Sequence, residues 1–161
     1  ALEPMPSTFQ YLKYNLESNG IKQLTEAEFH EGKPGVLALN RAVTADGRRV
    51  EVSYSPTKSM NAITSASTSD QQIPKDFDVK QSDQKTAIVD SVVLSKILAG
   101  EPKVPFLKID CEGCEHQVVP ALDRAGFLDK VMTGGAEVHP CRETHSCRWS
   151  EQEVRHTKAL L

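Results

Sequence analysis

The 161-residue sequence lacks several features that assign a chain directly to a functional class. It has no apolar run long enough to cross a bilayer and no segment with the pattern of a signal peptide. Its lysines and arginines nowhere form a basic stripe with interleaved aromatics, and its formal net charge is −3, so no nucleic-acid partner is expected. Hydrophobic residues make up 39% and charged residues 25%, which is typical of one soluble globular domain.

Cysteine is also scarce, and it is confined to the last third of the chain, at Cys111, Cys114, Cys141 and Cys147. Four cysteines are a sparse framework for a secreted, disulfide-stabilised protein of this length. Reduced thiols are therefore expected, and a cytoplasmic location is favoured. Because the chain begins with Ala1 rather than methionine, its N-terminal end is interpreted as truncated.

Apolar strands alternate with amphipathic helices along most of the chain. Strands are predicted to end at residues 2–4 and to cover residues 36–43, 48–54, 104–110 and 130–138. Helices are predicted from capping boxes at Ser7/Gln10 and Thr25/Glu28, from an N-cap at Asp90, and after Glu112-Gly113. Pro120 conflicts with the last of these helices, since proline lacks an amide donor. The alternation predicts an α/β fold with a doubly wound, mostly parallel, Rossmann-like sheet.

Two segments lack this periodicity. Residues 55–85 are rich in Ser, Thr, Asp, Gln and Lys, and they are predicted to form a mobile loop, a lid or an exposed excursion. Residues 140–161 form a polar C-terminal tail with a capping box at Ser150 and Glu153. Residues 1–161 are interpreted as one domain.

The segment from Phe106 to Glu115 carries the strongest functional signal. An apolar strand ends in the carboxylate of Asp110, and Gly113 permits a tight turn into a helix. In open α/β sheets ligands bind beyond the carboxyl ends of the strands, where Asp110 is expected. A structural interpretation is equally open, in which Asp110 caps the helix and Glu112 and Glu115 are solvated acids of its first turn.

The stretch Leu-Lys-Ile-Asp-Cys-Glu-Gly-Cys-Glu, residues 107–115, resembles the Leu-Lys-Ile-Asp-x-Glu-Gly-x-Glu signature of FkbM-type methyltransferases. Further matches follow in the family's order from residue 2 to residue 139. They are Leu2-Glu3-Pro4 with Phe9, Leu12, Asn15, Leu16 and Asn19-Gly20, then Arg41-Ala42-Val43, Asp46-Gly47, Ser59-Met60-Asn61 and Glu137-Val138-His139. The resemblance therefore extends over most of the chain.

The resemblance implies an S-adenosylmethionine-dependent methyltransferase that methylates a hydroxyl of a small molecule or glycan. It places Glu3 at the ribose hydroxyls, Asn40 and Ala42 beside the adenine, and Asp110 near the methionine end of the cofactor. It also implies that Asp110, Glu112 and His139 hold the acceptor hydroxyl or remove its proton. Without the resemblance, Glu3 reads as an exposed turn acid and His139 as a surface histidine.

The sequence departs from the family pattern in one important place. It contains no Asp-x-Gly-x-x-Gly-like cofactor loop, and Glu3 already marks the family's second strand. The first strand lies between the second and the fourth, so its loss is expected to leave two sheet halves with open inner edges. The chain is therefore interpreted as a fragment that binds the cofactor poorly.

Two alternatives remain open from the residues. Cys111-x-x-Cys114, with Cys141, Cys147 and nearby histidines, supplies ligands for zinc or thiols for a redox module. A degenerate relative that acts as a non-catalytic scaffold also accounts for the missing loop.

Overall fold

We describe the protein from a computed structural model, in which residues 1–55, 58–65, 85–111, 114–138 and 151–160 are described. Its helices are α1 (Pro6–Ser18), α2 (Glu26–His30), α3 (Leu94–Ile97), α4 (Glu115–Arg124), the short 3₁₀ helix η2 (Leu128–Lys130) and α5 (Glu151–Ala159). Its strands are β1 (Ala42–Val43), β2 (Val50–Ser55), β3 (Lys58–Ser65), β4 (Lys85–Val89), β5 (Ser91–Val92), β6 (Leu107–Ile109) and β7 (Gly134–Ala136).

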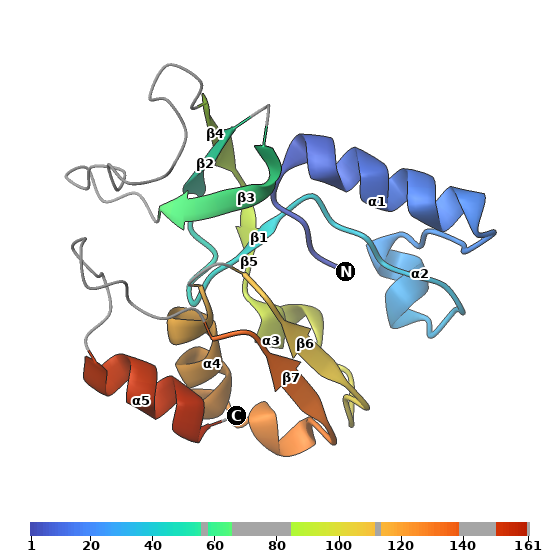
Figure 1. The fold of residues 1–161 in the computed structure, drawn as a ribbon. Helices are drawn as coiled ribbons and strands as arrows, with labels where there is room; N and C mark the ends of the chain where they lie inside the picture. The colour runs from blue at the N-terminus through green and yellow to red at the C-terminus, as the bar shows by residue number, and fades with distance from the viewer. Residues whose placement is uncertain (56–57, 66–84, 112–113, 139–150, 161) are drawn as a thin grey trace.

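Short parallel strand pairs lie in the middle and the lower part of the fold as drawn in Figure 1. β1 pairs with β5, and β6 pairs with β7. Isolated parallel bridges join Leu2 to Leu39, Gln23 to Val36, and Val104 to Val131. The strands predicted at 36–43, 104–110 and 130–138 are therefore present, but their regular parts are shorter than predicted.

A three-stranded antiparallel sheet with the order β3-β2-β4 lies above these pairs in Figure 1. The alternation predicted for residues 48–54 is confirmed, because Val50 and Val52 are fully buried while Glu51 between them is partly exposed. Their side chains pack with Met5, Ala42 and Val89 in the first hydrophobic core cluster. β2 pairs antiparallel with both β3 and β4.

The chain changes sheets at Asp90. β4 before it pairs antiparallel with β2, and β5 after it pairs parallel with β1. Asp90 accepts a main-chain hydrogen bond from the Ala42 amide at 2.9 Å, and its carboxylate lies 2.9 Å from Arg49. The prediction that Asp90 caps a helix is therefore wrong, and the helix α3 begins only after Val93.

Proline determines where α1 begins. Pro6 occupies the first turn and Met5 is the N-cap, so Ser7 lies inside the helix and its predicted capping box is wrong. The end was predicted correctly, because Gly20 follows the helix with a positive φ of 65°. The capping box at Thr25 and Glu28 is confirmed at the start of α2, where the Glu28 amide donates to Thr25 Oγ1 at 3.2 Å.

The second core cluster is built on α4. Val118, Val119 and Leu122 pack against Ile109 of β6 and against Phe127, and all five are buried. Pro120 lies inside α4 and does not end it, contrary to the conflict noted in the sequence. The buried residues on either side of Pro120 hold this part of the helix in the core, so tertiary packing outweighs the lost hydrogen bond.

Regular structure lies within both of the segments that lack the alternating periodicity. β3 lies within the predicted loop 55–85, whose residues 66–84 are outside the described part. α5 begins at Glu151, so a helix is present where the capping box at Ser150 and Glu153 predicts one. α5 lies beside α4 (Figure 1), and His116 Nδ1 of α4 is 3.2 Å from Thr157 Oγ1 of α5. Ser150, the predicted cap, is also outside the described residues. The result is a mixed α/β fold with small parallel sheets, which is compatible with the predicted class.

Candidate cofactor and active site

Asp110 lies directly after β6, at the carboxyl end of that strand. β6 is held by its pairing with β7 and by the buried side chain of Ile109, so the backbone before Asp110 is well anchored. The Asp110 side chain is 36% exposed, and its Oδ2 lies 3.2 Å from Nζ of Lys108. The structure therefore places the strongest sequence candidate where α/β sheets bind ligands.

Lys108 was not singled out in the sequence analysis. It stands two residues before Asp110, and side chains two apart on a strand lie on the same face. The spacing of two residues between Lys108 and Asp110 was the sequence signal that could have identified Lys108. Lys108 supplies a positive charge beside a carboxylate that the resemblance places against the cofactor.

A cavity of about 430 Å³ opens beside Asp110. One wall comes from β6, with Leu107 and Ile109, and the opposite wall includes Leu2 and Leu39. The volume is within the range of small-molecule sites, but the lining is mostly apolar. Asp110 and Lys108 are the charged side chains among the described residues around it.

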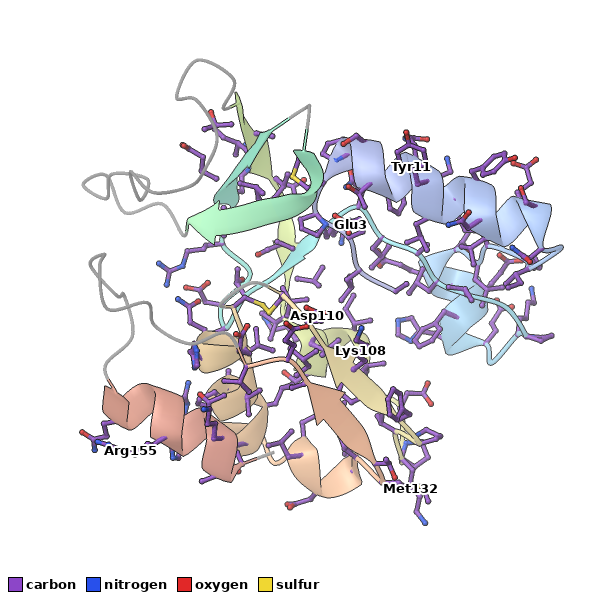
Figure 2. All side chains as sticks on the ribbon, viewed as in Figure 1. Glu3, Tyr11, Lys108, Asp110, Met132 and Arg155 are labelled. Carbon is purple, nitrogen blue, oxygen red and sulfur yellow. A yellow bond between two sulfur atoms is a disulfide. The ribbon has the colours of Figure 1, made fainter. Side chains whose placement is uncertain are left out.

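Glu3 lies on the other half of the fold, and Figure 2 shows it apart from Asp110 across the centre of the molecule. Its Oε1 accepts a hydrogen bond from the Met5 amide at 2.8 Å, and its own amide donates to Leu39 at 3.1 Å. Burial raises the pKa of the Glu3 carboxyl, although the hydrogen bond from Met5 opposes this effect. Glu3 is thus a half-buried acid held in one orientation, rather than an exposed turn acid.

Asn40 and Ala42 have different structural roles. The Asn40 amide nitrogen donates to the carbonyls of Glu3 and Pro4, at 2.8 and 2.9 Å, so it holds the strand end that carries Glu3. Ala42 is 4% exposed and belongs to the first core cluster. Their predicted contacts with the adenine remain predictions. Glu112 and His139, the other predicted catalytic residues, lie outside the described residues.

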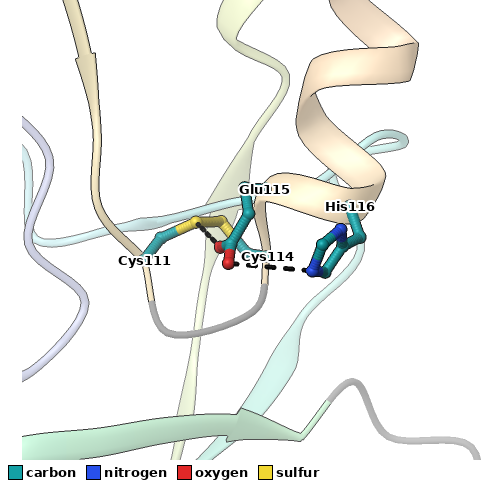
Figure 3. The surroundings of a disulfide bond; sticks show 4 residues. All are labelled: Cys111, Cys114, Glu115 and His116. Carbon is teal, nitrogen blue, oxygen red and sulfur yellow. Dashed lines mark hydrogen bonds and ion pairs between the residues drawn. A yellow bond between two sulfur atoms is a disulfide. The ribbon is translucent and has the colours of Figure 1, made fainter. Parts of the chain in front are cut away.

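Cys111 and Cys114 form a disulfide immediately before α4, on the wall of the same cavity (Figure 3). The expectation of reduced thiols is therefore wrong for this pair. A disulfide leaves neither sulfur as a thiolate for zinc, and no metal-binding group of three or more His, Cys, Asp or Glu exists among the described residues. The zinc alternative is not favoured. Cys141 and Cys147 lie outside the described residues.

The fold and the site define an α/β protein with an anchored carboxylate at the end of a parallel strand, beside an apolar cavity. A sequence model of the FkbM methyltransferase domain matches residues 1–140. The chain belongs to the FkbM methyltransferase family, as its motifs predict. No curated protein and no solved structure matches the chain. In the described part, no helix is long and apolar enough to span a membrane.

Proposed function

We propose that the protein transfers a methyl group from S-adenosylmethionine to a hydroxyl of a small molecule or glycan. The observation that carries this proposal is the position of Asp110, which lies beside a cavity at the end of β6 in a chain of a methyltransferase family. The acidic net charge and the absence of a basic stripe favour such an acceptor over a nucleic acid.

The carboxylates present fit the polar ends of this cofactor. We assign Glu3, whose Oε1 accepts a hydrogen bond from the Met5 amide, to the ribose hydroxyls, and Asp110, which lies beside Lys108, to the amino group or the sulfonium. When bound, S-adenosylmethionine supplies an already activated methyl group. The protein's own task is to align the acceptor oxygen and to remove its proton, which we assign to Asp110, Glu112 or His139.

The mostly apolar part of the cavity fits a protein segment better than it fits the polar ends of the cofactor. It lies between Leu2 on one side and β6 on the other, and among the described residues neither segment has a strand partner on the cavity side. A sheet edge with free amides and carbonyls is a template for strand addition. We propose that a further parallel strand occupies this gap, which makes the sheet continuous and doubly wound, and that the cofactor binds at its carboxyl end.

Backbone hydrogen exchange in the full-length protein tests the added strand. The Leu107 amide donates toward β7, so the next amide, that of Lys108, points to the cavity side. We expect the Lys108 amide to exchange at least about tenfold more slowly than a solvated amide, because it is paired with the added strand. Exchange of Lys108 at the rate of a solvated amide, with Leu107 protected, would contradict the added strand.

The substitution Glu3→Gln tests the cofactor site. The amide keeps an oxygen for the Met5 amide but loses the charge, and charged acceptors make the stronger hydrogen bonds. The Kd for S-adenosylmethionine, measured by calorimetry on the full-length protein, is therefore expected to rise about tenfold or more. Glu17→Gln, on the exposed face of α1, is the matched control and leaves the Kd unchanged.

The stability of the Glu3→Gln protein is not expected to fall, although its affinity for the cofactor does. The folded-state pKa of Glu3 is raised, so ionisation of Glu3 opposes folding as the pH rises through that pKa. Removing the charge should leave the melting temperature at pH 7 unchanged or raise it. An unchanged Kd would show that Glu3 does not hold the ribose, and a full-length protein that binds no S-adenosylmethionine would overturn the proposed function.

A further inference from the structure

The disulfide between Cys111 and Cys114 contacts a buried acid. Oε2 of Glu115 lies 3.4 Å from Sγ of Cys111, and the Glu115 side chain has no exposed surface (Figure 3). Both cysteines are partly exposed, and we take this exposed surface as the route by which an external thiol reaches the pair. A buried carboxylate beside an accessible cysteine pair is the arrangement that proton transfer in thiol chemistry requires.

Two further buried polar side chains lie near Glu115. Oε1 of Glu115 lies 3.9 Å from Nε2 of His116, and Nδ1 of His116 lies 3.2 Å from Oγ1 of Thr157 on α5. His116 and Thr157 are also buried. Glu115 thus belongs to a buried polar cluster at the contact between α4 and α5, and it is not an exposed acid.

The position of the pair in the chain suits reversible chemistry. Cys114 immediately precedes α4, and the N-terminus of a helix stabilises a thiolate, so Cys114 is a good leaving group when an external thiol attacks Cys111 during reduction. Cysteine pairs with this spacing at a helix start are typical of dithiols that exchange with other disulfides.

We propose that Cys111 and Cys114 form a reversible dithiol–disulfide redox site in which Glu115 accepts the proton of the Cys111 thiol. In the oxidising direction, Glu115 takes this proton and the Cys111 thiolate attacks an external small-molecule disulfide. A mixed disulfide forms and one external thiolate leaves, taking up a proton. Cys114 then attacks Cys111 Sγ, loses its own proton and releases the second external thiol. Two electrons and two protons pass from the protein to the external disulfide, and reduction is the reverse.

The site has a direct consequence for Asp110, and this part rests on the proposed function. Cys111 follows Asp110 in the chain, so the disulfide ties the residue after Asp110 to the start of α4. Reduction removes this tie and leaves Asp110 less well positioned. We therefore expect the oxidised protein to bind S-adenosylmethionine more tightly than the reduced protein.

The redox site is tested first without any methyl transfer. In the full-length protein carrying Cys141→Ser and Cys147→Ser, dithiothreitol is expected to expose two thiols in the chain described here, and oxidised glutathione to close them again. Alkylation followed by mass spectrometry counts these thiols. Glu115→Gln is expected to slow closure about tenfold or more, because the proton acceptor is lost. Asp123→Asn, an exposed acid on the same helix, is the matched control and closes at the parental rate.

A second pair of variants keeps the proposal testable if Glu115→Gln does not fold. In the Cys114→Ser protein only Cys111 remains, and in the Cys111→Ser protein only Cys114 remains. Cys111 should form a mixed disulfide with glutathione about tenfold faster than Cys114. Equal or reversed rates would overturn the role of Glu115. A disulfide that dithiothreitol cannot open in the folded protein would overturn the redox site itself.

Cofactor binding separates the two proposals. A tighter Kd for S-adenosylmethionine in the oxidised protein supports the link between the redox site and Asp110, and equal Kd values in the two forms overturn that link while the methyltransferase stands. If neither form binds the cofactor, the proposed function fails, and the thiol measurements still decide the redox site.

Discussion

Replacing Asp110 with alanine is expected to lower methyl transfer by the full-length protein at least about a hundredfold, since a positioned proton acceptor or charge contributes about that much or more. The cost in stability should be about 1 kcal/mol or less, because Asp110 loses only a partly exposed ion pair with Lys108. The initial rate with labelled S-adenosylmethionine and the melting temperature, measured on the same sample, separate lost chemistry from lost folding.

Lys108→Gln is the matched control for this experiment. It removes the same ion pair but leaves the carboxylate of Asp110 in place. We expect it to lose much less activity than Asp110→Ala, because the carboxylate remains. If the Asp110→Ala protein transfers methyl groups at the parental rate, Asp110 has no catalytic role and the assignment of the site is wrong.

The largest expected effect on stability comes from Phe127→Ala. Phe127 is 3% exposed and packs with Val119 and Leu122 of α4 in the second core cluster. Truncating a buried phenylalanine to alanine costs about 3–5 kcal/mol, from lost burial and from the cavity that remains. In a domain whose total stability is about 5–15 kcal/mol, this substitution removes much of it.

Chemical denaturation of the full-length protein measures this loss. Phe106→Ala is the matched control, since it makes the same chemical change at a side chain that is 61% exposed. Its effect should be within about 0.5 kcal/mol. Similar losses in the two variants would show that Phe127 does not anchor the core as described.

Local signals in the sequence were sufficient for several elements. Thr25 and Glu28 are three residues apart, so their capping box forms within one turn and needs no tertiary partner. The alternation of Val50 and Val52 likewise identified a strand with one buried face. The expectation failed at Ser7, because Pro6 moved the start of the helix by its own local preference.

The sequence did not show which segments, distant along the chain, pair with one another in the fold. Residues 58–65 have a serine-rich, polar composition, yet they form β3 because β2 offers an edge to pair with. Asp90 was predicted to cap a helix, but its carbonyl bonds to Ala42, 48 residues earlier in the chain. Strand pairing depends on such non-local contacts, and a window of neighbouring residues does not contain them.

The candidate site divides in the same way. The sequence alone determined the family, through the ordered motifs from Leu2 to His139, and it identified Asp110 as a carboxylate at a strand end. Only the tertiary structure decided that Asp110 pairs with Lys108 and lines an apolar cavity, and that Glu115 lies buried against a Cys111–Cys114 disulfide. The physical reason is that residue type and spacing specify local conformation, whereas burial, ion pairing and disulfide formation depend on which distant segments the folded chain brings together.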